Sequence, residues 1–144
     1  MGIIDFGCIK ELPDEFYYPF FSLTSEGFFN DKEKTLQAFR QLEMIHEKDS
    51  ASEVEFYYDM YRQMIGLFAK PYSSESFDFS GTEFFEQIYN YGEMIAKMPE
   101  FKQARGVKHF IYVNRTNFGL YNILHELKAT VRTDTYVPQV AYAD

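Results

Sequence analysis

Hydrophobic residues recur at helical spacing along most of the chain. The clearest stripe has apolar positions three or four residues apart, at Tyr57, Met60, Tyr61, Met64, Ile65 and Phe68. Ser52 is followed three residues later by Glu55, a spacing typical of a capping box, so we expect a helix to begin there. Pro71 lies just beyond the stripe and should end that helix, because proline lacks a backbone donor.

Weaker helical patterns precede and follow this stripe. Pro13 suits the first turn of a helix, whereas Pro19 should kink or split the same segment. Asn30 or Asp31 can cap the next helix. The predicted helices besides the central one cover residues 12–25, 31–46, 80–98 and 107–131.

The two helices after Pro71 have their own local signals. Ser80 and Glu83 form a second Ser-x-x-Glu pattern, which predicts a capping box after a loop over residues 72–80. Gly92 would allow a neighbouring helix to come close. Asn117 interrupts the apolar face of the last helix, which we expect to be formed by Phe110, Val113, Leu120, Tyr121, Leu124 and Leu127.

These elements predict a mainly α fold of five or six helices after a short extended segment at residues 2–5. The length of 144 residues fits one domain over residues 1–144, and residues 132–144 should form a loosely ordered tail. The chain contains 16 Phe and 12 Tyr but no Trp. So many rings predict an aromatic core together with an apolar surface for a partner, and we expect a homodimer.

Charge and composition exclude several classes of protein. The net charge of −8 comes from acids spread along the chain, which argues against binding to nucleic acid or to an anionic membrane surface. No apolar run approaches the roughly 20 residues of a membrane span. Cys8 is the single cysteine, so we expect a reduced, cytoplasmic protein in which this thiol is a half-buried neighbour of the turn.

Other polar side chains give weaker signals. His46, His109 and His125 lack metal-ligand spacing and are predicted to lie on helix surfaces or at caps. Arg115 lies within an aromatic helix, where a buried guanidinium needs a partner. We therefore expect Arg115 to form a structural ion pair that orients the last helix.

The beginning of the chain has the most specific motif. An apolar pair leads into an acidic turn and then a helix-opening proline, in the string Ile3-Ile4-Asp5-Phe6-Gly7-Cys8-Ile9-Lys10-Glu11-Leu12-Pro13. This string resembles the corresponding segment of the AarF/UbiB family of atypical protein-kinase-like ATPases. A second, weaker similarity covers residues 110–124, which resemble a late family helix carrying an arginine before a Leu-rich stretch.

The resemblance implies a role for the Asp5-Phe6-Gly7 triplet. Asp5 would hold the Mg²⁺ that bridges the phosphates of ATP, Phe6 would pack beneath it, and Gly7 would let the backbone turn. Family members carry the nucleotide-covering loop, the phosphate-pairing lysine and the catalytic loop before this triplet. The chain is therefore expected to be the helical C-terminal part of a kinase-like domain, whose partner is the missing N-terminal lobe.

Catalysis and cofactor binding by these residues alone are not expected, because phosphoryl transfer needs several separately positioned parts. The resemblance links the whole protein to ubiquinone or related quinone biosynthesis. Two alternatives remain open. One is a stand-alone helical interaction module in which the triplet is a coincidence, and the other is a helical protein whose Tyr-rich faces form a groove for an isoprenoid-like lipid.

Overall fold

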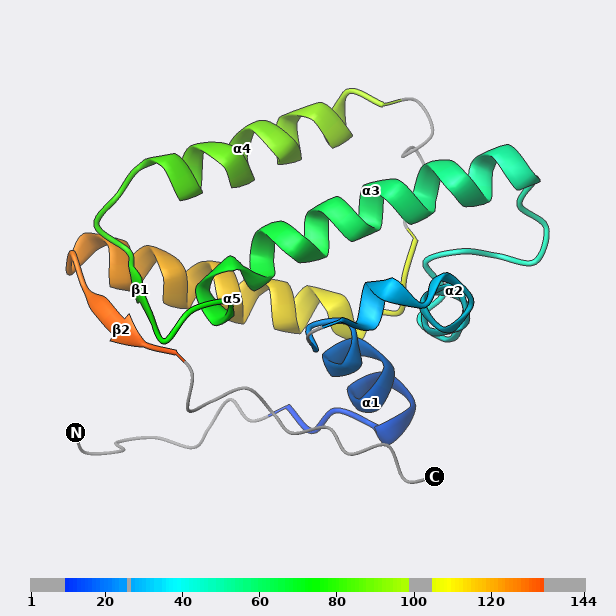
Figure 1. Ribbon diagram of the computed structural model, residues 1–144, viewed down its shortest axis with the longest axis horizontal. Helices are drawn as coiled ribbons and strands as arrows, with labels where there is room; N and C mark the ends of the chain where they lie inside the picture. Colours follow the sequence, from blue (N-terminus) through cyan, green and yellow to red (C-terminus); the bar gives the residue numbers. More distant parts are fainter. Residues whose placement is uncertain (1–9, 26, 99–104, 134–144) are drawn as a thin grey trace.

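The computed structural model describes residues 10–25, 27–98 and 105–133. Helices dominate this part of the chain, so the mainly α class predicted from the sequence is confirmed (Figure 1). In chain order the elements are α1 (Asp14–Ser22), the 3₁₀ turn η1 (Phe28–Asn30), α2 (Lys32–Gln41), α3 (Ala51–Ala69), the 3₁₀ turn η2 (Lys70–Tyr72), β1 (Ser76–Asp78), α4 (Glu83–Ala96), α5 (His109–Glu126) and β2 (Thr130–Arg132).

The long helix α3 is the centre of the arrangement. Figure 1 shows α4 running back alongside α3 on one side, with α5 on the other side and the shorter α1 and α2 near one end. A short antiparallel ladder pairs β1 with β2, with Phe77 opposite Val131. This ladder joins the segment before α4 to the segment after α5.

The hydrophobic core has two clusters. The larger one lies among α1, α2 and α3 and includes Phe39 and Leu42, whose side chains are completely buried. The smaller cluster joins the β1–β2 ladder to α4 and α5 through Phe79, Phe84 and Tyr121. The Tyr121 hydroxyl donates a hydrogen bond of 3.1 Å to the Phe68 carbonyl, so this buried ring also anchors α5 to the end of α3.

Helix α3 matches the strongest prediction, but its N-cap lies two residues earlier than predicted. Ser50, not Ser52, is the N-cap, and its side chain and that of Glu53 form the reciprocal capping box. Both serines satisfy the same Ser-x-x-Glu pattern, so local sequence alone does not choose between them. Glu55 instead forms an exposed ion pair with Lys32.

The second predicted capping box, from Ser80 to Glu83, is also wrong. The N-cap of α4 is Thr82, whose side chain makes no capping bond within the part of the chain that the structure describes. The Ser80 backbone N–H donates to the Asp78 carboxylate at 2.8 Å, so Ser80 belongs to a turn that ends β1. Part of the loop predicted over residues 72–80 is thus a strand.

Helices α2 and α5 end earlier than predicted, and both end in the same way. Glu43 and Lys128 adopt left-handed backbone conformations, with φ of 56° and 49°. Hydrogen bonds from Met44 N to Phe39 O and from Ala129 N to Leu124 O then close a Schellman motif at each end. Neither position is a glycine, so the sequence contains no conventional stop signal.

Pro19 does not split α1, which is continuous from Asp14 to Ser22. The hydrogen bond lost at proline would have gone to the carbonyl of Glu15, an exposed residue near the helix start where water can hydrate that group. Among the described residues, no atom from outside its own helix lies within 4 Å of the position that a Cβ on Gly92 would take, so the predicted close approach of a neighbouring helix is not seen there. The predicted strand at residues 2–5 and nearly all of the predicted tail lie outside the described residues.

Candidate functional site

A cavity of about 400 Å³ lies where α1, α3 and α5 meet. Helix α1 and its C-cap contribute Phe20 and Leu23, and the second half of α3 contributes Ile65 and Phe68. The first half of α5 completes the wall with Phe110 and Val113, among other residues. The three elements come together because their apolar stripes share one core.

Aromatic contacts fix the wall of this cavity. The rings of Phe16 and Phe20 stack with their centroids 5.1 Å apart, and Phe20 meets Phe110 edge to face at 5.4 Å. Near the other end of the wall, Phe68 meets Phe118 edge to face at 5.2 Å. Such ring pairs restrict side-chain rotation, so the cavity is largely preformed.

Polar groups also line this cavity, and they differ in their partners. The hydroxyls of Thr24 and Thr116 donate to carbonyls one helical turn earlier, at 2.7 and 2.9 Å. The side-chain amides of Asn114 and Asn117 form no hydrogen bond within the described part of the chain. Lys10 places its ammonium 5.6 Å from the centre of the Tyr112 ring.

The charge at the cavity is opposite to that of the whole chain. The chain has a net charge of −8, yet no Asp or Glu occurs among the described lining residues, and Lys10 is a cation there. The cavity therefore combines an apolar interior with one positive charge and two amides. This combination suits an amphiphile with an anionic or polar head.

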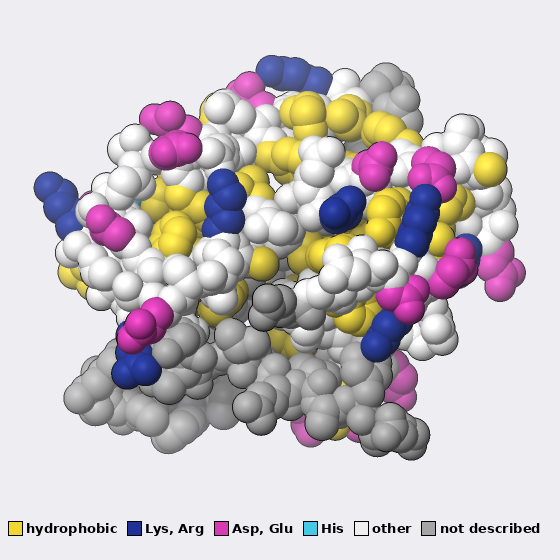
Figure 2. Space-filling model, viewed as in Figure 1, with side chains coloured by type: hydrophobic (Ala, Val, Ile, Leu, Met, Phe, Trp, Pro, Cys, Tyr) yellow, Lys and Arg dark blue, Asp and Glu magenta, His cyan; other side chains and the backbone are white. Residues whose placement is uncertain are grey.

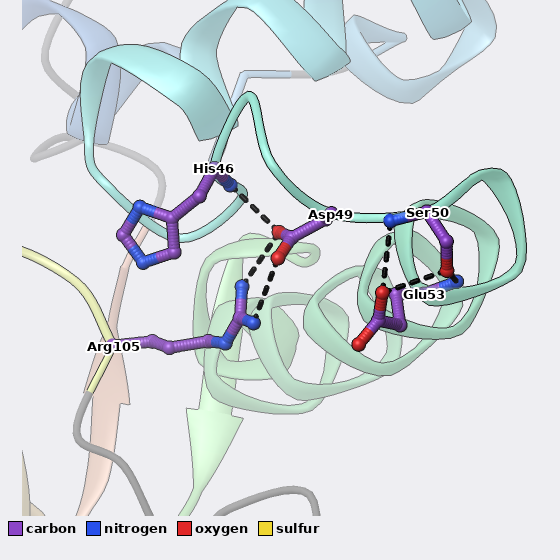
Figure 3. A network of polar contacts seen from close by, with 5 residues as sticks. All are labelled: His46, Asp49, Ser50, Glu53 and Arg105. Atoms are coloured by element: carbon purple, nitrogen blue, oxygen red, sulfur yellow. Dashed lines mark hydrogen bonds and ion pairs between the residues drawn. The ribbon is translucent and has the colours of Figure 1, made fainter.

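A second polar cluster lies at the junction between the loop after α2 and the segment before α5 (Figure 3). Arg105 forms two hydrogen bonds with the Asp49 carboxylate, at 2.7 and 2.9 Å, and the His46 backbone N–H donates to the same carboxylate at 2.7 Å. Mainly because of the Arg105 hydrogen bonds, the pKa of Asp49 falls from 3.8 to about 2. With both charges neutralised by each other, this cluster is a structural junction.

The structure corrects the prediction for Arg115. Its side chain is exposed and forms no ion pair within residues 10–25, 27–98 and 105–133. The arginine that forms the structural ion pair is Arg105, which precedes α5. Sequence reasoning missed this ion pair because Arg105 and Asp49 are 56 residues apart. Neither of them has an oppositely charged Lys, Arg, Asp or Glu three or four residues away, the spacing at which a helical ion pair can be recognised.

The three histidines have separate structural positions. His125 Nδ1 lies 2.7 Å from the Phe79 carbonyl and its ring packs on Phe85, so it is half-buried and links α5 to the turn after β1. His109, at the first position of α5, has a buried Nδ1 without a hydrogen-bond partner among the described residues, and its ring packs near that of Phe16. The described residues include no cluster of His, Cys, Asp and Glu that could hold a metal ion.

The predicted nucleotide and metal residues Asp5, Phe6 and Gly7, together with Cys8, lie outside the described residues. Comparisons with protein-family models, with curated proteins and with solved structures find no match to this chain. Among the helices that the structure describes, none has both the length and the apolar character needed to cross a bilayer.

Proposed function

We propose that this chain is the helical C-terminal part of an AarF/UbiB-like atypical kinase or ATPase. In the whole protein Asp5 would hold Mg²⁺ on ATP, while the described helices would form the scaffold behind that site. The activity belongs to the quinone-biosynthesis class that the resemblance implies. We expect no ATP hydrolysis by the helical part alone, because phosphoryl transfer needs several separately positioned parts.

The observation that carries this proposal is the start of α1. The resembling string ends at Leu12-Pro13, and α1 begins at Asp14 with Pro13 as its N-cap. Helix α5 spans the whole of the second resembling stretch, residues 110–124. Both observations concern where the helices lie relative to the resembling segments. The role of Asp5 in holding Mg²⁺ rests on the resemblance.

Two experiments test this proposal. The coding DNA upstream of Met1 should contain, in frame, the lysine and the Asp- and Asn-containing catalytic loop of a kinase-like domain; a stop codon directly upstream would contradict it. In the longer polypeptide, Mg²⁺-dependent binding of an ATP analogue should be lost in Asp5→Asn and retained in the control Asp14→Asn. If the 144 residues alone hydrolyse ATP and Asp5→Asn abolishes that activity, the prediction that this part is inactive by itself is wrong.

A second candidate, a helical interaction module, is favoured by the exposed face of α5. We call this face the α5 stripe and define it as Leu120, Ile123 and Leu127, spaced by three and four residues. Ile123 and Leu127 are 59% and 69% exposed, although Leu120 and Leu127 were predicted to face the core. Hydrophobic side chains also reach the surface at several places on the face seen in Figure 2.

The regular spacing of the α5 stripe suits packing against another helix, and a second copy of the chain is the partner that we expect. Light scattering at increasing concentration should show a dimer for the natural sequence. The double substitution Ile123→Glu and Leu127→Glu should leave a monomer, whereas Tyr89→Glu on the exposed side of α4 should not. A mass that stays monomeric at all concentrations would contradict this candidate.

A further inference from the structure

We infer that the cavity between α1, α3 and α5 binds a medium-chain alkanoate, with its chain inside and its carboxylate beside Lys10, Asn114 and Asn117. This inference does not depend on the kinase-like assignment. It concerns residues that the structure describes, whereas the proposed nucleotide site depends on Asp5. Each can therefore fail without the other.

The size of the cavity selects the length of the chain. The volume of about 400 Å³ falls within the roughly 300–1,000 Å³ typical of small-molecule sites. A methylene takes about the volume of a liquid water, roughly 30 Å³, so the cavity holds on the order of a dozen carbon atoms. Decanoate and dodecanoate fit this volume, whereas longer chains exceed it.

The polar groups select the head of the ligand. Asn117 is half-buried on the core side of α5, where a polar side chain without a partner costs free energy. Its amide and that of Asn114, one turn earlier, can both donate to a carboxylate. A ligand carboxylate would therefore give the Asn117 amide the hydrogen-bond partner that packing on this otherwise apolar face does not provide.

Charge favours a carboxylate over a phosphate ester. Lys10 is the one cation among the described lining residues, and a doubly charged phosphate is usually held by several cationic or backbone donors. The single positive charge of Lys10 matches the single negative charge of a carboxylate. Because Lys10 is exposed, the head would remain at the mouth of the cavity while the chain enters between Phe20, Phe110 and Ile65.

A chain-length series tests the apolar part of the inference. Isothermal titration with hexanoate, octanoate, decanoate, dodecanoate and tetradecanoate, each below its micelle concentration, should show affinity rising about fourfold per methylene up to dodecanoate. The rise should stop beyond dodecanoate, when the cavity is full. The absence of binding at millimolar decanoate to folded protein, or an affinity independent of chain length, would overturn the inference.

Head-group variants test the polar part. Decanol and methyl decanoate should bind about three- to tenfold more weakly than decanoate. Lys10→Gln should weaken the binding of decanoate by the same factor and leave the binding of the two uncharged ligands unchanged. Asn117→Ala should lower the affinity for decanoate by a similar factor. The matched controls Lys108→Gln and Asn122→Ala lie outside the cavity and should bind decanoate unchanged.

The melting temperature of each variant should be measured to confirm that the variant folds. Because Lys10 is exposed, its substitution should leave the fold intact. Equal losses in Lys10→Gln and Lys108→Gln would indicate unspecific charge attraction and would overturn the assigned head site. If the double substitution Ile123→Glu and Leu127→Glu abolishes decanoate binding together with the dimer, the ligand lies at the α5 stripe and not in the cavity. That result would also contradict the inference.

Discussion

Arg105 and Asp49 hold together two loops that are 56 residues apart in the sequence. Their side chains are 11% and 3% exposed and meet through two hydrogen bonds, so neither charge is left to water. The Arg105 guanidinium also lies over the Tyr57 ring, 3.8 Å from its centre. The pair thus fixes the segment before α5 against both the loop after α2 and the face of α3.

Removing one partner of this pair should destabilise the protein strongly. Arg105→Ala leaves the Asp49 carboxylate buried without a counter-charge, and the free energy of unfolding should fall by about 3–5 kcal/mol. Urea denaturation monitored by circular dichroism measures the change. The control Lys97→Ala removes an exposed ion pair with Glu93 and should change stability by less than about 1 kcal/mol. Equal effects of the two substitutions would refute a buried structural role.

The same pair should make stability depend on acid pH. The folded state lowers the pKa of Asp49 from 3.8 to about 2, mainly through the Arg105 hydrogen bonds. Since the folded pKa is the lower one, the contribution is fully present above about pH 4 and is lost as pH falls towards 2. The loss amounts to about 2 kcal/mol.

Other carboxylates titrate in this range too, so the difference between two proteins is the informative quantity. Unfolding free energies of the natural protein and of Asp49→Asn, measured from pH 6 to pH 2, should converge as the pH falls. Two curves that stay parallel through this range would show that Asp49 has an ordinary pKa in the folded protein.

The sequence predicts the helices well where a stripe is long and regular. Helix α3 follows from six apolar positions, because burial against both neighbours requires that periodicity. The ends of α2 and α5 could not be predicted, since Glu43 and Lys128 occupy left-handed positions where glycine is the usual signal. Long-range backbone hydrogen bonds accompany both ends: Gly106 and Val107 donate to the carbonyls of Glu43 and Leu42, and Phe79 donates to that of Ala129.

The candidate site was only partly predictable for a related reason. Asn117 stood out as a polar interruption of an apolar face, and it does line the cavity. The contribution of Lys10 and of the second half of α3 depends on how three helices cross, which spacing within one helix does not reveal. The exchange of Arg115 for Arg105 has the same origin, because an ion pair is a property of two distant segments.

The choice between the two serine capping boxes can be measured directly. Ser50→Ala removes the hydroxyl that caps α3 and that donates to Glu53 at 2.6 Å, so it should cost about 1 kcal/mol of stability. Ser52→Ala is the matched control, two residues later in the same pattern, and should cost less than about 0.5 kcal/mol. A larger effect at Ser52 would mean that α3 begins two residues later in solution.

The left-handed end of α5 predicts a substitution that stabilises the protein. Lys128 has φ of 49° and is exposed, so a glycine there would relieve the contact between its Cβ and the backbone without losing packing. Lys128→Gly should raise the free energy of unfolding by about 0.5–1 kcal/mol, allowing for the greater entropy of glycine in the unfolded chain. The matched control is Glu126→Gly, two residues earlier at the last position of α5, which should lose about 1 kcal/mol because it has ordinary helical geometry. Thermal and urea unfolding of both variants measure the pair of effects. Destabilisation by Lys128→Gly comparable to that of the control would show that α5 continues through residue 128 as an ordinary helix.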